Sequence, residues 1–127
     1  KYLYRDIRTL RLVEANIEYD YKYYNRDCFK ELKERYREDE IIIVKGGFIT
    51  DTTFSNLVFE KGNRLYTPAT YLLNGIMRQN LLKKGIICEA KITKDNIYTF
   101  DAIILINAMN NIDTLYKIPI NHDTIIM

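Results

Sequence analysis

Apolar and polar residues alternate along several short stretches of this chain, a pattern that is typical of half-buried β-strands. Elsewhere, the continuous run Ile41-Ile-Ile-Val44 is typical of a strand buried on both faces, and Gly46-Gly47 ends that run. The two patterns together predict strands over residues 2–14 (one or two strands), 17–22, 40–45, 86–92 and 102–108.

Turn residues shape the remaining β-prone segments. Residues 56–66 carry two short β-prone runs around Lys61-Gly62-Asn63, which predicts a hairpin that ends at Thr67-Pro68. The segment 115–120 is predicted to be an edge strand, because the proline at position 119 is tolerated only where no ladder partner is needed.

Helical spacing of apolar residues appears after Asp27, a good N-cap, where it predicts an amphipathic helix over residues 27–37. A second helix is predicted to be capped by Asn74 and to end at Gly85 in a left-handed conformation. The apolar side chains expected to face the core from this helix are Ile76, Met77, Leu81 and Leu82. Residues 93–101 are weakly helical.

These elements predict an α+β protein in which a mixed sheet packs with about three helices, in one domain of residues 1–127. The net charge of +2, from 19 basic and 17 acidic residues, gives no indication of a nucleic-acid or membrane partner. His122 is the only histidine, which argues against a His-based triad and a multi-histidine metal site. Cys28 and Cys88 have no framework spacing, so we expect reduced thiols in a cytoplasmic protein.

Four motifs occur in order along most of the chain. The first is Lys22-Tyr-Tyr-Asn-Arg26, and the second is Gly47-Phe-Ile-Thr-Asp-Thr-Thr-Phe-Ser-Asn-Leu-Val-Phe59. The third combines Tyr66-Thr-Pro68 with Leu73-Asn-Gly-Ile-Met-Arg78, and the fourth is Ile106-Asn-Ala-Met109. Each motif alone is weak evidence for membership of a protein family, whereas the four motifs in this order are specific enough to indicate one.

Together, these motifs resemble the class IV family of pyridoxal-phosphate (PLP) enzymes, which includes aminodeoxychorismate lyases and branched-chain aminotransferases. The resemblance is nearest to the lyases, partly through Ile49-Thr-Asp-Thr52 and Asn74-Gly-Ile-Met-Arg-Gln79. It implies that residues 1–127 form the large, C-terminal domain of the fold typified by D-amino-acid aminotransferase. Family enzymes also carry an N-terminal small domain, which we expect to be missing from this sequence.

The resemblance implies that Lys22 is the catalytic residue, which binds PLP as a Schiff base and moves protons at the substrate carbon. Four tyrosines at positions 19, 21, 23 and 24 surround this lysine in the sequence. Partial burial among them would lower the pKa of the amine and favour its neutral, nucleophilic form. The alternative is a solvated lysine at the end of a strand.

By the same resemblance, Asp51 pairs with the pyridine nitrogen of the cofactor, where many members have glutamate instead. An anion there keeps the nitrogen protonated, so that the ring accepts electrons. Asn56 and Thr53 are expected to support the ring and its loop. The alternative for Asp51 is a turn aspartate. For Arg26 and Arg78 we expect plain salt bridges, the alternatives being that Arg26 supports the lysine segment and that Arg78 orients the helix after Asn74.

The resemblance places the cofactor phosphate at the helix that follows Asn74. The free N–H groups and the dipole of a helix N-terminus suit an anion. The backbone amides of Ile76 and Met77 would bind the phosphate, and Gly75 would allow its close approach. Asn107 and Ala108 would close the other side, although the family often has a hydroxyl residue there. The alternative is an ordinary capped helix, and the two roles are compatible because amides bind while side chains pack.

Three functions remain open from the sequence. The first is a PLP-dependent lyase that forms 4-aminobenzoate and pyruvate for folate synthesis. The second is a class IV aminotransferase for branched-chain or D-amino acids, and the third is a truncated, non-catalytic relative. For the enzymes we expect a small-molecule amino substrate, a homodimer, and no metal, nucleic acid or membrane.

Overall fold

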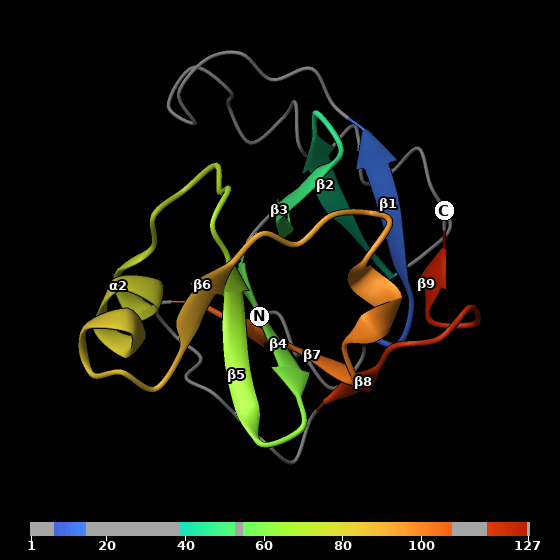
Figure 1. The fold of residues 1–127 in the computed structure, drawn as a ribbon. Helices are drawn as coiled ribbons and strands as arrows, with labels where there is room; N and C mark the ends of the chain where they lie inside the picture. The colour runs from blue at the N-terminus through green and yellow to red at the C-terminus, as the bar shows by residue number, and fades with distance from the viewer. Residues whose placement is uncertain (1–6, 15–38, 53–54, 108–116, 127) are drawn as a thin grey trace.

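The computed structural model describes residues 7–14, 39–52, 55–107 and 117–126. Within these ranges the chain forms two mixed β-sheets, one α-helix and one short 3₁₀ helix (Figure 1). Mixed sheets with few helices agree with the predicted α+β class, although the predicted sheet is divided into two. The strand predicted over 17–22 and the helix predicted over 27–37 lie outside the described residues and stay predictions.

The first sheet has the strand order β3-β2-β1-β9. Its strands are β1 (Leu10–Glu14), β2 (Glu40–Lys45), β3 (Phe48–Thr52) and β9 (Ile125–Ile126). The central strand β1 is parallel to both neighbours, whereas β2 and β3 are antiparallel. Gly46 and Gly47 connect β2 to β3 with φ angles of 58° and 83°, which glycine adopts without steric cost. The glycine pair therefore ends β2, as expected, but it also starts a hairpin whose second strand the sequence pattern missed.

The second sheet has the strand order β6-β5-β4-β7-β8. Its strands are β4 (Asn56–Lys61), β5 (Arg64–Pro68), β6 (Cys88–Ala90), β7 (Ala102–Ile106) and β8 (Ile118–Pro119). The antiparallel pair β4–β5 confirms the hairpin predicted around Gly62. Strand β8 lies at the edge of the sheet, as the proline at position 119 predicted, and β6 is shorter than the predicted 86–92.

The helix α2 (Ile76–Lys83) ends as predicted and begins differently. Gly85 has a φ of 74°, and the amides of Gly85 and Ile86 donate to the carbonyl oxygens of Leu82 and Leu81. This pair of bonds is the Schellman arrangement that favours glycine after a helix. The expectation that Asn74 caps the other end is wrong, because Gly75 is the N-cap residue and no side chain caps this end.

Two apolar cores lie on opposite faces of the second sheet. Because successive side chains of a strand point to opposite faces, neighbouring residues of one strand belong to different cores. Leu57 and Phe59 of β4 pack with Ile42 and Val44 of the first sheet. On the other face, β4 and β7 pack against the apolar side of α2; this core includes Val58, Leu81, Ile87, Ile104 and Ile106. The described chain is therefore built in three layers, with α2 on the outer face of the second sheet (Figure 1).

One residue of α2 contradicts its predicted orientation. Ile76 is 69% exposed, although helical spacing placed it in the core. Met77 and Leu82 are half-buried against the core around Leu81, as expected. Ile76 stands in the first turn of the helix, whereas Leu81 lies one to two turns further along over β4 and β7. Among the described residues, no helix is long and apolar enough to cross a membrane.

Candidate cofactor-binding site

Asp51 is buried near the end of β3, and its carboxylate is held by three hydrogen bonds. Leu72 and Leu73 each donate a backbone N–H to Oδ2 at 2.9 Å, and Asn56 donates Nδ2–H to Oδ1 at 3.1 Å. The side chain is only 5% exposed. Asp51 is therefore not the simple turn aspartate of the alternative interpretation, because it joins β3 to the connection between β5 and α2.

Asn56, the first residue of β4, links this carboxylate to the start of α2. Its Nδ2 also donates to the carbonyl oxygen of Leu73 at 2.8 Å, so both of its donors act on the site. On the other side, a Cβ atom placed on Gly75 would lie less than 3.0 Å from Oδ1 of Asn56. The structure thus requires glycine at position 75 for close approach to Asn56, a steric reason that the sequence did not reveal.

The N-terminus of α2 has the properties of an anion site. No side chain caps it, and no acidic residue lies in its first turn. The first hydrogen bond of the helix is donated by the N–H of Gln79 to the carbonyl oxygen of Gly75, at 3.0 Å. The amides of the first turn, including those of Ile76 and Met77, precede this bond and have no helical acceptor. Such amides, aligned with the helix dipole, favour a bound phosphate.

Burial raises the pKa of Asp51 from its ordinary 3.8 to about 6. The hydrogen bonds from Leu73, Leu72 and Asn56 and the charge of Arg78 act in the opposite direction but do not cancel the effect of burial. Near neutral pH the carboxylate is ionised and its negative charge is costly to bury. A cation placed beside it would therefore bind favourably.

This pKa predicts how the stability of the unliganded protein depends on pH. Because the folded-state pKa is raised, the protonated carboxyl contributes stability that is fully present below about pH 3.8 and is lost as pH rises through about 6. Relative to Asp51→Asn, the free energy of unfolding of the wild-type protein should fall by about 2 kcal/mol between about pH 4 and pH 7. Urea unfolding at several pH values measures this difference, and a constant difference would contradict the raised pKa.

The described residues bring together part of the predicted site. Asp51, Asn56 and Gly75 form one contiguous group, and Ile76 and Met77 follow directly in α2. Of the predicted phosphate residues after β7, Asn107 is half-buried and follows the residue that pairs with Asn56 across β4 and β7. Lys22, Thr53, Arg26 and Ala108 lie outside the described residues, so their roles stay predictions.

Two features of the site were missed by sequence reasoning. The first is the pair of amides at Leu72 and Leu73, which the sequence could not assign to Asp51 because backbone donors leave no residue-type signal. The second is the burial of Arg78, expected to form a plain salt bridge. Its ion pair with Glu89 exists, at 2.5 Å between Nη2 and Oε2, but it is one of several contacts. No cluster of metal-ligating side chains occurs within the described ranges.

Comparison with known proteins assigns the chain to a family. The sequence profile of the amino-transferase class IV family matches residues 22–113. An uncharacterized protein of Haemophilus influenzae is 44% identical over 98 residues, which cover 76% of this chain and 52% of that protein. A protein described as a putative aminodeoxychorismate lyase of Schizosaccharomyces pombe is 31% identical over 80 residues (59% of this chain, 35% of that protein). D-alanine aminotransferase of Bacillus licheniformis is 34% identical over 73 residues (52% and 26%).

Solved structures have the same fold. A protein described as a putative 4-amino-4-deoxychorismate lyase from Haemophilus somnus superposes with a TM-score of 0.76 at 33% identity, over 84% of this chain and 56% of that one. A protein described as a hypothetical aminotransferase from Mycobacterium tuberculosis, with alpha-ketoglutarate and PMP bound, superposes with a TM-score of 0.66 at 16% identity (91% and 47%). The chain thus spans about half the length, or less, of the proteins it matches. By its profile match over residues 22–113, it belongs to the amino-transferase class IV family.

Proposed function

We propose that this chain is the cofactor-binding part of a PLP-dependent lyase that converts 4-amino-4-deoxychorismate to 4-aminobenzoate and pyruvate. The observation that carries the proposal is the buried carboxylate of Asp51, joined through Asn56 to Gly75 at the uncapped N-terminus of α2. An anion for the ring nitrogen and a phosphate site are thereby held by one contiguous group of residues. The lyase reaction is favoured by the 33% identity to the Haemophilus somnus protein.

The described residues fit PLP by their chemistry. The two oxygens of an ionised carboxylate offer about four acceptor positions, and the three hydrogen bonds to Asp51 leave one free on Oδ1. That position can accept a hydrogen bond from a protonated ring nitrogen, whose positive charge offsets the cost of the buried anion. The amides of Ile76 and Met77 can bind the phosphate.

Each residue then has a separate role. When bound, PLP supplies an electron sink for bond breaking at the amino-bearing carbon of the substrate. Asp51 keeps the ring nitrogen protonated, and Asn56 holds Asp51 in place. Gly75, Ile76 and Met77 position the phosphate end, with Asn107 and Ala108 closing its other side. In this proposal Lys22 binds the cofactor covalently and transfers the proton at the substrate carbon.

A class IV aminotransferase is the second candidate, and one observation favours it. The 34% identity to D-alanine aminotransferase of Bacillus licheniformis is as high as the identity to the lyase-like proteins, although it covers a smaller share of this chain. The site around Asp51 suits both reactions, because both need the ring as an electron sink. The third candidate, a non-catalytic relative, would bind no PLP.

The products separate these candidates. The protein is incubated with PLP and 4-amino-4-deoxychorismate, and 4-aminobenzoate and pyruvate are quantified together. The lyase proposal predicts equal amounts of the two products, and their loss in Lys22→Ala with retention in Lys91→Ala, which removes an exposed lysine after β6. Transfer of the amino group of D-alanine or a branched-chain amino acid to a 2-oxo acid, without 4-aminobenzoate, would replace it with the aminotransferase.

The assembly and cellular place of the protein are also part of this proposal. We propose that it acts in the cytoplasm as a homodimer on a small-molecule amino substrate. Light scattering of the protein with and without PLP measures the mass directly, and a monomer that turns over substrate would contradict the dimer.

A further inference from the structure

Arg78 is a buried cation in the first turn of α2, and it is held on three sides. The residue is only 2% exposed. Its Nη2 donates to the carbonyl oxygen of Pro68 at 3.1 Å and pairs with Oε2 of Glu89 at 2.5 Å, while Nη1 donates to Oδ1 of Asn74 at 2.9 Å. Nε is buried and has no hydrogen-bond partner among the described residues, so the buried charge depends on these three contacts, which fix the positions of the groups that accept them.

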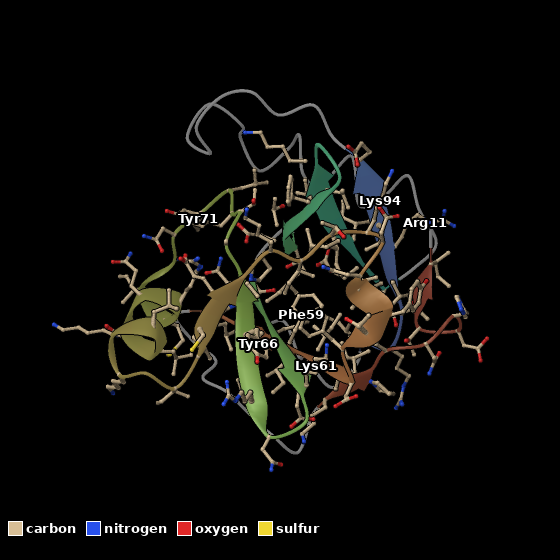
Figure 2. The ribbon with its side chains drawn as sticks, in the orientation of Figure 1. Arg11, Phe59, Lys61, Tyr66, Tyr71 and Lys94 are labelled. Carbon is tan, nitrogen blue, oxygen red and sulfur yellow. The ribbon has the colours of Figure 1, made fainter. Side chains whose placement is uncertain are left out.

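The partners of Arg78 span the whole connection between β5 and α2. Pro68 ends β5, and Asn74 immediately precedes the N-cap of the helix. Midway between them, the ring of Tyr71 lies with its centroid 4.2 Å from the guanidinium carbon. Figure 2 shows Tyr71 on this connection, away from Phe59 in the core between the sheets. Arg78 therefore contacts the start, the middle and the end of one segment.

The candidate cofactor site also holds this segment. The N–H groups of Leu72 and Leu73 donate to Asp51, and the carbonyl oxygen of Leu73 accepts from Asn56. Residues 68–75 are thus held both by the guanidinium of Arg78 and by the Asp51–Asn56 pair. A shift of this segment would move the two amides away from Asp51 and change the direction of the first turn of α2.

On the basis of the function proposed above, we propose that Arg78 is a positioning residue for the cofactor site. It holds residues 68–75 in the shape that directs the amides of Leu72 and Leu73 at Asp51 and leaves the N-terminus of α2 open to the phosphate. Arg78 acts on the cofactor site through this segment, and this role depends on the planar, forked arrangement of N–H donors in its guanidinium group. Lysine carries the same charge but cannot donate to three acceptors in one plane.

The variant Arg78→Lys tests this role because it keeps the charge and removes the fork. Its control is Lys83→Gln, which removes an exposed charge from the last turn of the same helix. Native-state hydrogen exchange reports the segment directly and needs no cofactor. In Arg78→Lys, the amides of Leu72 and Leu73 should exchange at least about tenfold faster while those of β4 and β7 keep their protection. The control should exchange like the wild-type protein.

A second readout separates positioning from a loss of packing. The pKa of Asp51, followed by carbon NMR of its carboxyl group, depends on burial, on the amides of Leu73 and Leu72, on Asn56 and on the charge of Arg78. Arg78→Lys keeps the charge, so withdrawal of the two amides from a carboxylate that stays buried should raise the pKa above about 6. Loosened packing that admits water would instead lower it toward 3.8.

PLP affinity completes the test. Fluorescence titration with PLP should show binding at least about tenfold weaker in Arg78→Lys than in the control. The proposal is overturned if Leu72, Leu73 and the pKa of Asp51 are unchanged, if β4 and β7 lose protection equally, or if PLP binding is not weakened. Failure of the wild-type protein to bind PLP would instead remove the proposed function, while the first two readouts still decide whether Arg78 positions the segment. If Arg78→Lys does not fold, Glu89→Gln is measured in its place. This variant removes the charge that pairs with Arg78, and the fold should tolerate it because the side chain of Glu89 is 47% exposed.

Discussion

Asp51→Asn is expected to lower turnover about 100- to 1,000-fold, the range measured when one group that stabilises developing charge is removed from an active site. The substitution keeps the shape of the side chain, and its carbonyl oxygen can still accept from Leu72 and Leu73. It removes the negative charge that would keep the ring nitrogen of the cofactor protonated, and it replaces Oδ1, which accepts from Asn56, by an N–H donor. The measurement is kcat for the protein saturated with PLP, so that weaker cofactor binding is not counted as slower chemistry.

Asp101→Asn is the matched control for this substitution. Asp101 also accepts a backbone hydrogen bond, from Gly62 N–H at 2.9 Å, but at the far end of β4 from Asn56. Its replacement should leave kcat unchanged. If Asp51→Asn retains full kcat with PLP bound, Asp51 is a structural carboxylate that only holds the connection between β5 and α2, and its role toward the ring is lost.

Gly75→Ala is expected to destabilise the fold by about 1–3 kcal/mol and to weaken PLP binding at least about tenfold. The added Cβ would overlap Oδ1 of Asn56. Asn56 cannot move aside without breaking its hydrogen bonds to Asp51 and to the carbonyl oxygen of Leu73. The clash therefore disturbs the carboxylate and the helix N-terminus together. Thermal unfolding and PLP titration measure the two effects.

Gly85→Ala, at the other end of α2, tests whether a loss of stability alone is enough to weaken PLP binding. Nothing lies within 4 Å of a Cβ at this position, but its φ of 74° is strained for alanine and costs about 1–2 kcal/mol. This variant should lose stability and keep its affinity for PLP. Equal losses of affinity in Gly75→Ala and Gly85→Ala would mean that binding follows stability alone, and that the contact between Gly75 and Asn56 has no special role.

The sequence predicted the parts of the fold that apolar residues and turn residues mark. The run at 40–45 and the hairpin around Gly62 were confirmed because both combine β-prone residues with clear turn signals. Strand β3 was missed because three of its buried residues, Thr50, Asp51 and Thr52, are polar. The hydroxyl of Thr50, for example, can be buried because it donates a hydrogen bond to the carbonyl oxygen of Ile43 at 2.6 Å. Burial that depends on hydrogen bonds across a hairpin leaves no hydrophobic pattern.

For the site, the sequence selected candidate residues but did not indicate how they are connected. Asp51, Asn56 and Gly75 were each selected from motifs, and the structure shows that they touch. The burial of Arg78 could not be predicted, because its partners Pro68 and Glu89 lie on two different strands. Long-range pairing of this kind is determined by the register of β5 and β6, which a single sequence does not specify.

The central claim is that this chain binds PLP through Lys22, and reductive labelling tests it most directly. The protein is mixed with PLP, reduced with borohydride and digested, and the modified lysine is identified by mass spectrometry. We predict one label per chain, located at Lys22 and absent from Lys22→Ala. Scattered labelling of surface lysines that is unchanged in Lys22→Ala would contradict the claim and favour a relative that has the family fold without its cofactor.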